Sequence, residues 1–129
     1  MTEDRARARL DALPSRYPRL FPKGPLTYGF ELGSGWTFLI EVLCERIDTI
    51  LKDSPSTTME VVQVKEKFGR LRFYYGLEGA DGVVNDALRQ AVHAVETASA
   101  HCCERCGATG SLDEKGGWLS TRCPNCSDC

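Results

Sequence analysis

Apolar side chains recur at helical spacing through a long stretch of the first half of the chain. The set is Trp36, Leu39, Ile40, Leu43, Ile47, Ile50 and Leu51. This period predicts an amphipathic helix over 35–52, with Ser34 as its N-cap and an end before Pro55. We expect Trp36 to anchor the core, and Cys44 to behave as a small buried hydrophobe at the border of the apolar face.

A second helical period predicts a helix that opens at Asp81 or Gly82 and runs to about Ala100. Its buried stripe is Val84, Ala87, Leu88, Ala91, Val95 and Ala98, and its outer side holds Arg89, Gln90, His93 and Glu96. We expect this helix to deliver Cys103 directly into the first turn of a cysteine motif.

Between the two helices, alternating apolar and polar residues over 59–76 predict a β-hairpin. The expected apolar face holds Val62, Val64, Phe68, Leu71, Phe73 and Tyr75. The turn is Lys67-Phe68-Gly69-Arg70, where Gly69 can adopt a positive φ. A two-stranded hairpin is marginal by itself, so it must pack on helices or pair with a third strand.

The N-terminal segment predicts a helix over 3–13 that Pro14 stops. Residues 14–28 then form an irregular arm with three further prolines and the apolar residues Tyr17, Leu20 and Phe21. We expect these apolar side chains to lie on the main body, although such arms also wrap partners.

Four cysteines near the C-terminus form two matched pairs, Cys103-x2-Cys106 and Cys123-x2-Cys126, with sixteen residues between them. This spacing predicts one structural Zn2+ per chain, held by four thiolates. A disulfide set and unliganded thiols are the alternatives.

Other details of this segment bear on the ligand set. Gly116-Gly117 marks a turn between two short strands, and Trp118 and Leu119 would supply apolar cover. The rival ligands are Cys102 and His101, whereas Cys129 reads as a spare thiol; a second metal shared by these three is the remaining alternative. Cys103 is preferred because it and Cys123 then belong to equivalent pairs.

Composition narrows the class of protein. The 129 residues are 42% hydrophobic and 26% charged, which suits one soluble domain, or a domain plus a small metal module,. No apolar run approaches the roughly 18 residues that span a bilayer, and the N-terminus lacks a signal core. Seven cysteines, an odd number, favour reduced thiols and a cytoplasmic location,. The formal net charge of −2 counts against tight sequence-independent nucleic-acid binding,.

Catalytic motifs are absent from the sequence. His93 and His101 lie on or just after one helix, with no nucleophile motif and no phosphate-binding loop,. A four-cysteine shell leaves no open position for water, so we expect a non-enzymatic protein.

The segment Gln63-Val-Lys-Glu-Lys-Phe-Gly-Arg-Leu-Arg-Phe-Tyr-Tyr75, preceded by Gly35-Trp36 and followed by the two cysteine pairs, resembles a signature of small uncharacterised proteins from bacterial, phage and prophage genomes. The likeness covers about 28–126. It implies one fold unit and a mobile-element setting, in a bacterium or a phage-infected host, and no particular reaction.

These patterns predict an α+β fold: a helical body with an antiparallel hairpin and a C-terminal zinc ribbon. The expected parts are an N-terminal helix and arm (1–28), an α+β body (29–100) and a zinc module (101–129). We expect a protein-binding module that modulates a host or defence protein; the alternative is a nucleic-acid-binding regulator. The candidate contacts are Lys65, Lys67, Arg70, Arg72 and Tyr74 on the hairpin, with Tyr17 and Phe21 on the arm.

Overall fold

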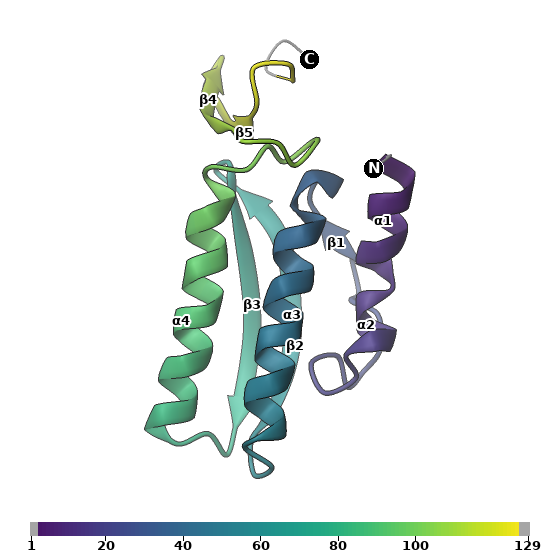
Figure 1. Ribbon diagram of the computed structural model, residues 1–129, viewed down its shortest axis with the longest axis vertical. Helices are drawn as coiled ribbons and strands as arrows, with labels where there is room; N and C mark the ends of the chain where they lie inside the picture. The colour runs from purple at the N-terminus through teal and green to yellow at the C-terminus, as the bar shows by residue number, and fades with distance from the viewer. Residues whose placement is uncertain (1–2, 127–129) are drawn as a thin grey trace.

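Two long helices pack on one face of a three-stranded sheet, and a small two-stranded ribbon follows at one end (Figure 1). The computed structural model describes residues 3–126. Its elements are α1 (Glu3–Asp11), α2 (Leu13–Arg16), β1 (Phe30–Glu31), the 3-10 turn η1 (Ser34–Trp36), α3 (Thr37–Lys52), β2 (Thr58–Lys67), β3 (Arg70–Glu78), α4 (Gly82–Ser99), β4 (Ser111–Lys115) and β5 (Trp118–Arg122). The α+β prediction is confirmed. Among the described helices, none is long and apolar enough to cross a membrane.

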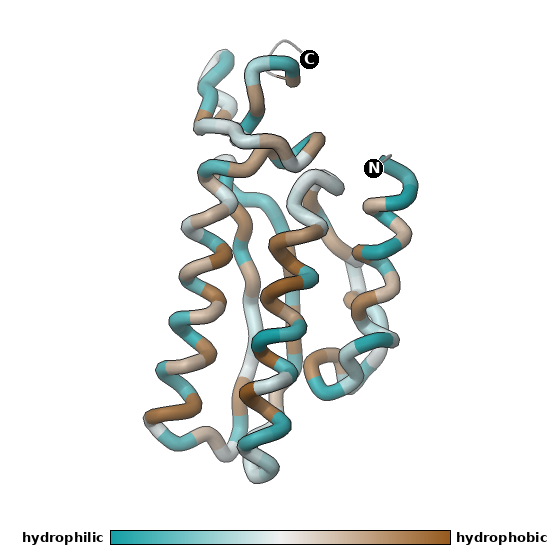
Figure 2. Tube along the Cα trace, in the orientation of Figure 1, coloured by the Kyte–Doolittle hydropathy of each residue, from teal (hydrophilic) through white to brown (hydrophobic). Residues whose placement is uncertain are grey.

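The core lies between the two long helices and the sheet. Apolar residues recur along α3 and α4, as the brown positions of Figure 2 show, and these stripes meet the inner face of β2 and β3. Trp36 and Cys44 are fully buried, as their positions on the apolar period predicted. The expected start of α4 is also confirmed, because the Asp81 carboxylate accepts a hydrogen bond from the Val84 N–H at 2.8 Å,.

The start of α3 differs from the prediction. Ser34 is not its N-cap: it lies in η1, and its side chain makes no capping hydrogen bond. Instead the Thr37 hydroxyl donates to the Ser34 carbonyl at 2.7 Å, inside the protein. The tight turn before the helix brings Gly35 and Trp36 into contact with the C-terminal segment.

The hairpin turn has the predicted geometry, since Phe68 and Gly69 both have positive φ values, 54° and 83°,. However, a β-bulge between Val61 and Gln63 changes the side-chain alternation,. Val61 is therefore buried and Val62 is 60% exposed, so Val62 does not belong to the apolar face. Phe68 was also assigned to that face wrongly, because it occupies the turn and is 65% exposed.

The third strand, β1, follows directly after the arm, and the arm lies on the body as expected. Phe30 pairs in parallel with Val64, and the Leu20 carbonyl accepts a hydrogen bond from the Val61 N–H at 2.8 Å. Pro14 does not stop the chain's helical course, because it sits in the first turn of α2, where proline is tolerated,. Phe21 is buried in the core, which removes it from the candidate partner contacts.

Candidate metal centre

The four predicted cysteines meet at one point. The sulfur atoms of Cys103, Cys106, Cys123 and Cys126 all lie within 4.8 Å of one another, and the Cys106 and Cys123 sulfurs are 3.5 Å apart. A tetrahedral metal with metal–sulfur bonds of about 2.3 Å has sulfur–sulfur edges of about 3.8 Å, so the cluster can hold a metal ion. Cys103 and Cys123 are buried, whereas Cys106 is exposed.

Local backbone geometry builds each half of the cluster. In the first turn, the Gly107 N–H donates to the Cys103 carbonyl at 2.9 Å, and in the second the Cys126 N–H donates to the Cys123 carbonyl at 3.1 Å. Gly107 has a φ of 85°, a conformation that favours glycine,. Two short turns, one closed by an i to i+4 hydrogen bond and the other by an i to i+3 hydrogen bond, therefore present two pairs of sulfurs to one another.

The β4–β5 ribbon brings the second pair round. Its two strands pair antiparallel and are joined at Gly116-Gly117, with φ values of 57° and 82°, as the sequence predicted. Trp118 does not cover the ribbon: its side chain is 72% exposed. The buried residue of β5 is Thr121, a polar residue that the apolar period could not select.

The protonation of the cluster favours a bound cation. Burial raises the pKa of Cys103, but backbone N–H groups pointing at its sulfur outweigh burial and bring the pKa to about 6. The hydrogen bond with the Cys123 thiol is the main reason that the pKa of Cys126 rises to about 12. Cys103 thus ionises more readily than Cys106 and Cys126, whose pKa values are raised. A cation bound by the four sulfurs would displace protons and offset the repulsion between thiolates.

The rival ligands lie elsewhere. The Cys102 thiol is 3.7 Å from the Gly35 carbonyl and 3.6 Å from the Gly107 carbonyl, and burial raises its pKa. His101 is exposed. Within residues 3–126, neither joins a group of three or more potential metal ligands, and Cys129 lies outside the described residues.

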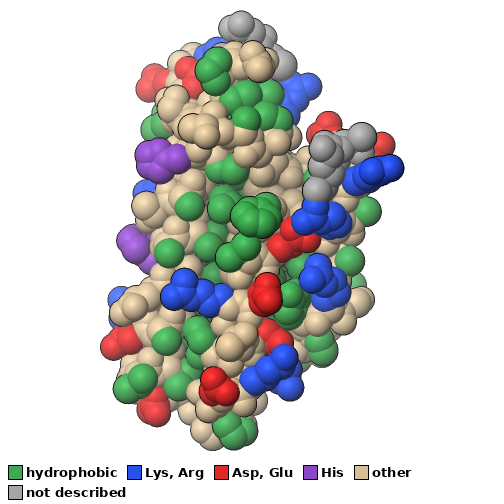
Figure 3. Space-filling model, in the orientation of Figure 1, with side chains coloured by type: hydrophobic (Ala, Val, Ile, Leu, Met, Phe, Trp, Pro, Cys, Tyr) green, Lys and Arg blue, Asp and Glu red, His purple; other side chains and the backbone are tan. Residues whose placement is uncertain are grey.

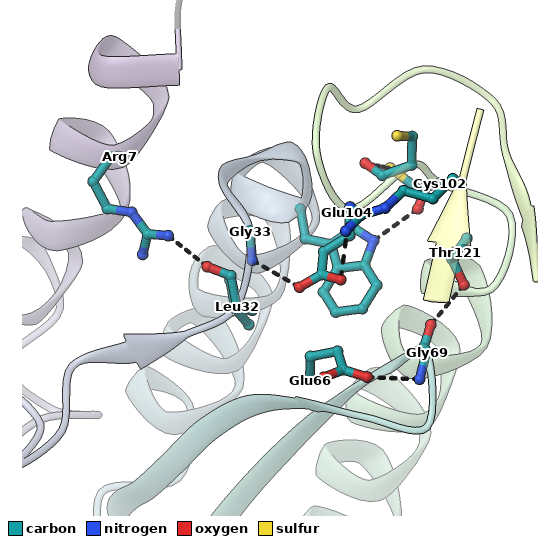
Figure 4. A network of polar contacts seen from close by, with 11 residues as sticks. Arg7, Leu32, Gly33, Glu66, Gly69, Cys102, Glu104 and Thr121 are labelled. Carbon is teal, nitrogen blue, oxygen red and sulfur yellow. Dashed lines mark hydrogen bonds and ion pairs between the residues drawn. The ribbon is translucent and has the colours of Figure 1, made fainter. Parts of the chain in front are cut away.

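The first cysteine turn is bonded to the start of α3 (Figure 4). The Glu104 carbonyl accepts from the Gly35 N–H at 2.7 Å, and its carboxylate accepts from the Gly33 N–H at 2.8 Å. The Trp36 indole N–H donates to the Cys102 carbonyl at 2.8 Å. Burial raises the pKa of Glu104, which the Gly33 hydrogen bond partly offsets. Sequence reasoning missed Glu104 because its partners are about seventy residues away.

The ribbon is also bonded to the hairpin turn. The buried Thr121 hydroxyl donates to the Gly69 carbonyl at 2.6 Å, and the Glu66 carboxylate accepts from the Gly69 N–H at 2.7 Å. Gly69 lies so close to Leu112 and Ser120 that an added Cβ would be 2.5 Å from a Leu112 methyl carbon. The ribbon therefore holds the hairpin turn in place by a hydrogen bond and by close packing.

The five hairpin candidates share one face of the sheet. Lys65 lies opposite Arg72 and Lys67 opposite Arg70, while Tyr74, which is 41% exposed, lies opposite Gln63. Directly opposed residues point to the same side of a sheet, and this side is opposite to the one that buries Val64, Leu71 and Phe73 against the helices,. The arm residue Tyr17 is only half-buried, with the Arg16 guanidinium 5.3 Å from its ring centroid.

Fold and cluster together define the class: an α+β protein whose C-terminal ribbon gathers four cysteines at one point. Compared with known proteins, the chain matches no family model, no curated protein and no solved structure.

Proposed function

We propose that this protein is a non-enzymatic binding module that uses the outer face of its hairpin to recognise an acidic surface of a partner protein. A structural Zn2+ would hold its C-terminal ribbon. The observation that carries the proposal is the two pairs of opposed cations, Lys65 with Arg72 and Lys67 with Arg70. Like charges directly opposite one another destabilise a sheet, so the arrangement has a cost that binding an anionic partner would offset.

Charges on the helix side of the molecule are arranged differently. Figure 3 shows acidic and basic side chains interspersed on that side. Several are paired, as in the ion pairs of Arg9 with Glu41 and of Arg19 with Asp48. By contrast, the four hairpin cations have no acidic partner within 4 Å among the described residues, and the buried Nε of Arg70 has no hydrogen-bond acceptor there. A carboxylate from a partner would give these cations the acidic partner that they lack.

The choice of zinc follows from the donor set. Four thiolates in a tetrahedral arrangement suit zinc or an iron–sulfur centre, and paired cysteine turns on a short ribbon are typical of structural zinc. Four sulfurs saturate such an ion, which supports a structural role. Bound there, the ion would join the two cysteine turns, and the Glu104 and Thr121 contacts would pass that rigidity to the body.

The biological setting remains that of the resemblance: a phage or prophage protein that modulates a host or defence protein. The test is a pull-down from nuclease-treated bacterial lysate with the wild type and the Arg70→Ala/Arg72→Ala variant. The control, Arg46→Ala/Lys115→Ala, removes the same charge from exposed positions elsewhere. We expect a partner that the wild type and the control retain and the hairpin variant loses. Equal capture by all three proteins would refute the assignment of this face.

Nucleic acid is the second class of anion that such a face could bind, and a filter-binding assay at low salt separates the two. Contacts with phosphate make affinity fall steeply with salt. We expect no retention of a single-stranded oligonucleotide, in keeping with the net charge of −2. Retention that Arg70→Ala/Arg72→Ala abolishes would instead identify a nucleic-acid-binding regulator.

A further inference from the structure

One edge of the three-stranded sheet is half covered. The strand order β1-β2-β3 leaves β3 at an edge, next to α4. There the Leu71 N–H donates to the Ser99 hydroxyl at 2.9 Å, and the Phe73 N–H donates to the Glu96 carboxylate at 2.9 Å. The sequence pattern predicted that Glu96 lies on the outer side of α4. This prediction is wrong, because the Glu96 carboxylate bonds to the edge of the sheet.

The remaining part of the edge is open. Along a strand, alternate N–H groups point to the same side, so those of Tyr75 and Leu77 point outward like those of Leu71 and Phe73. The opposite strand agrees, because the Val61 N–H, across from Tyr75, points away from β3 and donates to the Leu20 carbonyl. Among the described residues, no acceptor outside the strand ladder bonds the Tyr75 or Leu77 N–H.

A groove runs beside this open edge. Its volume is about 580 Å3, and it lies between β3 and α4, lined by Tyr75, Asp86, Arg89, Gln90, Val92, His93 and Glu96. An added strand would place the residues opposite Tyr75 and Leu77 on the groove side, where Val92 and the Tyr75 ring offer apolar contact. Residues opposite Tyr74 and Gly76 would lie on the outer face instead.

The added strand's residue on the outer face should be acidic. A side chain opposite Tyr74 lies diagonal to Arg72, and diagonal neighbours across a strand are within reach of long side chains. A glutamate there would pair with a guanidinium that has no acidic partner within 4 Å among residues 3–126. On the groove side, Val92 and the Tyr75 ring offer apolar contact among polar and charged neighbours, and the outer side favours acids. A segment of alternating apolar and acidic residues fits both sides.

We propose that an extended segment of a partner protein, with apolar side chains alternating with acidic ones, adds to β3 beside Tyr75 and Leu77 as a fourth strand. This inference rests on the proposed function, because it takes the acidic partner from there. Main-chain hydrogen bonds supply the affinity of such strand addition, and alternate side chains supply the specificity. Because Ser99 and Glu96 already accept from the Leu71 and Phe73 N–H groups, the added strand can bond only beside Tyr75 and Leu77.

The test uses 15N-labelled, metal-loaded protein and a synthetic peptide of alternating Val and Glu. A matched peptide carries N-methyl groups on the residues that would donate to β3. We expect the unmodified peptide to protect the Tyr75 and Leu77 amides from hydrogen exchange. The methylated peptide should bind about tenfold more weakly, since it loses main-chain donors.

A variant of the protein gives the reciprocal test. Leu77→Pro deletes an outward N–H without removing a bond to β2, and proline is tolerated on such edges. Leu77→Ala, the control, loses the same side chain and keeps the N–H. We expect weaker binding only for Leu77→Pro; if it fails to fold, the methylated peptide still decides.

The outcomes separate this inference from the proposed function. If both peptides bind equally, or if neither binds at millimolar concentration, strand addition is refuted. If Arg70→Ala/Arg72→Ala leaves the affinity for the unmodified peptide unchanged, the proposed role of the hairpin cations is refuted while strand addition stands. If protection of Tyr75 and Leu77 rises with protein concentration in the absence of peptide, the occupant is a second copy of this chain, and the proposal is overturned.

Discussion

Gly35→Ala should detach the cysteine ribbon from the body. A Cβ at this position would lie 2.3 Å from the Cys103 carbonyl oxygen and 2.5 Å from the Glu104 carbonyl oxygen. Both atoms belong to the backbone of the first cysteine turn, so no side-chain rotation can relieve the overlap. The turn must move away from the start of α3, and the bonds between them must lengthen or break.

The expected cost follows from the bonds at this contact. Three hydrogen bonds join the two segments, donated by the Gly33 and Gly35 N–H groups and the Trp36 indole to acceptors on Cys102 and Glu104. At about 1 kcal/mol each, their loss lowers the free energy of unfolding by about 3 kcal/mol. For a chain of this size, that corresponds to a fall in Tm of roughly 10 °C.

Urea unfolding followed by circular dichroism measures this cost. The control is Gly82→Ala, because an added Cβ there meets nothing within 4 Å and its φ is not positive. It should be neutral or slightly stabilising, since alanine reduces the entropy of the unfolded chain. Metal content should stay at the wild-type level in both variants, because all four cysteines remain. A Gly35→Ala protein as stable as the Gly82→Ala control would refute the close contact between the first cysteine turn and the start of α3.

Three further changes test the ribbon and the core. Cys106→Ser should release the metal and disorder the ribbon, because a structural site contributes about 10–16 kcal/mol in small zinc peptides. Elemental analysis measures the release, and retention of one ion per chain would contradict the ligand set. Thr121→Val should lower the free energy of unfolding by about 1–3 kcal/mol, measured in urea, because it keeps the volume and leaves the Gly69 carbonyl without its donor,. Cys44 should resist iodoacetamide at pH 8 in the native protein, because burial raises its pKa to about 12 and the thiolate is the reactive form,. Mass spectrometry measures the labelling, and rapid labelling of the native protein would show that the core around Cys44 opens.

Local periodicity was sufficient to predict much of this fold. Helix α4 begins at Gly82, one of its two predicted starts, and the turns at Gly69 and Gly116-Gly117 have the positive φ values that their positions required. Such features depend on neighbours within a few residues, which the sequence displays directly. The meeting of the four cysteines also follows from short-range features, because each Cys-x2-Cys forms its own turn and the β4–β5 ribbon between them reverses the chain.

Two of the wrong predictions have a different cause, since each depends on a contact between distant segments. The bulge near Val61 lets β2 bond to the arm at Leu20 on one side and to β3 on the other, and it turns Val62 out to solvent. The Glu96 side chain points toward β3 and not to solvent, because it accepts a hydrogen bond from the Phe73 N–H at the sheet edge. Nothing in the local pattern around either residue signals these partners.

The long-range contacts give a physical reason for three motifs of the sequence. Gly35-Trp36, the hairpin turn and the first cysteine turn are far apart in sequence, yet they meet at one end of the molecule. Glycine at 35 lets the cysteine turn approach, and Trp36 bonds to it. Thr121 joins the ribbon to Gly69, between the cations Lys67 and Arg70. A metal that orders the ribbon is therefore expected to fix the spacing of the two cations nearest the turn, which links the cysteine cluster to the proposed binding face.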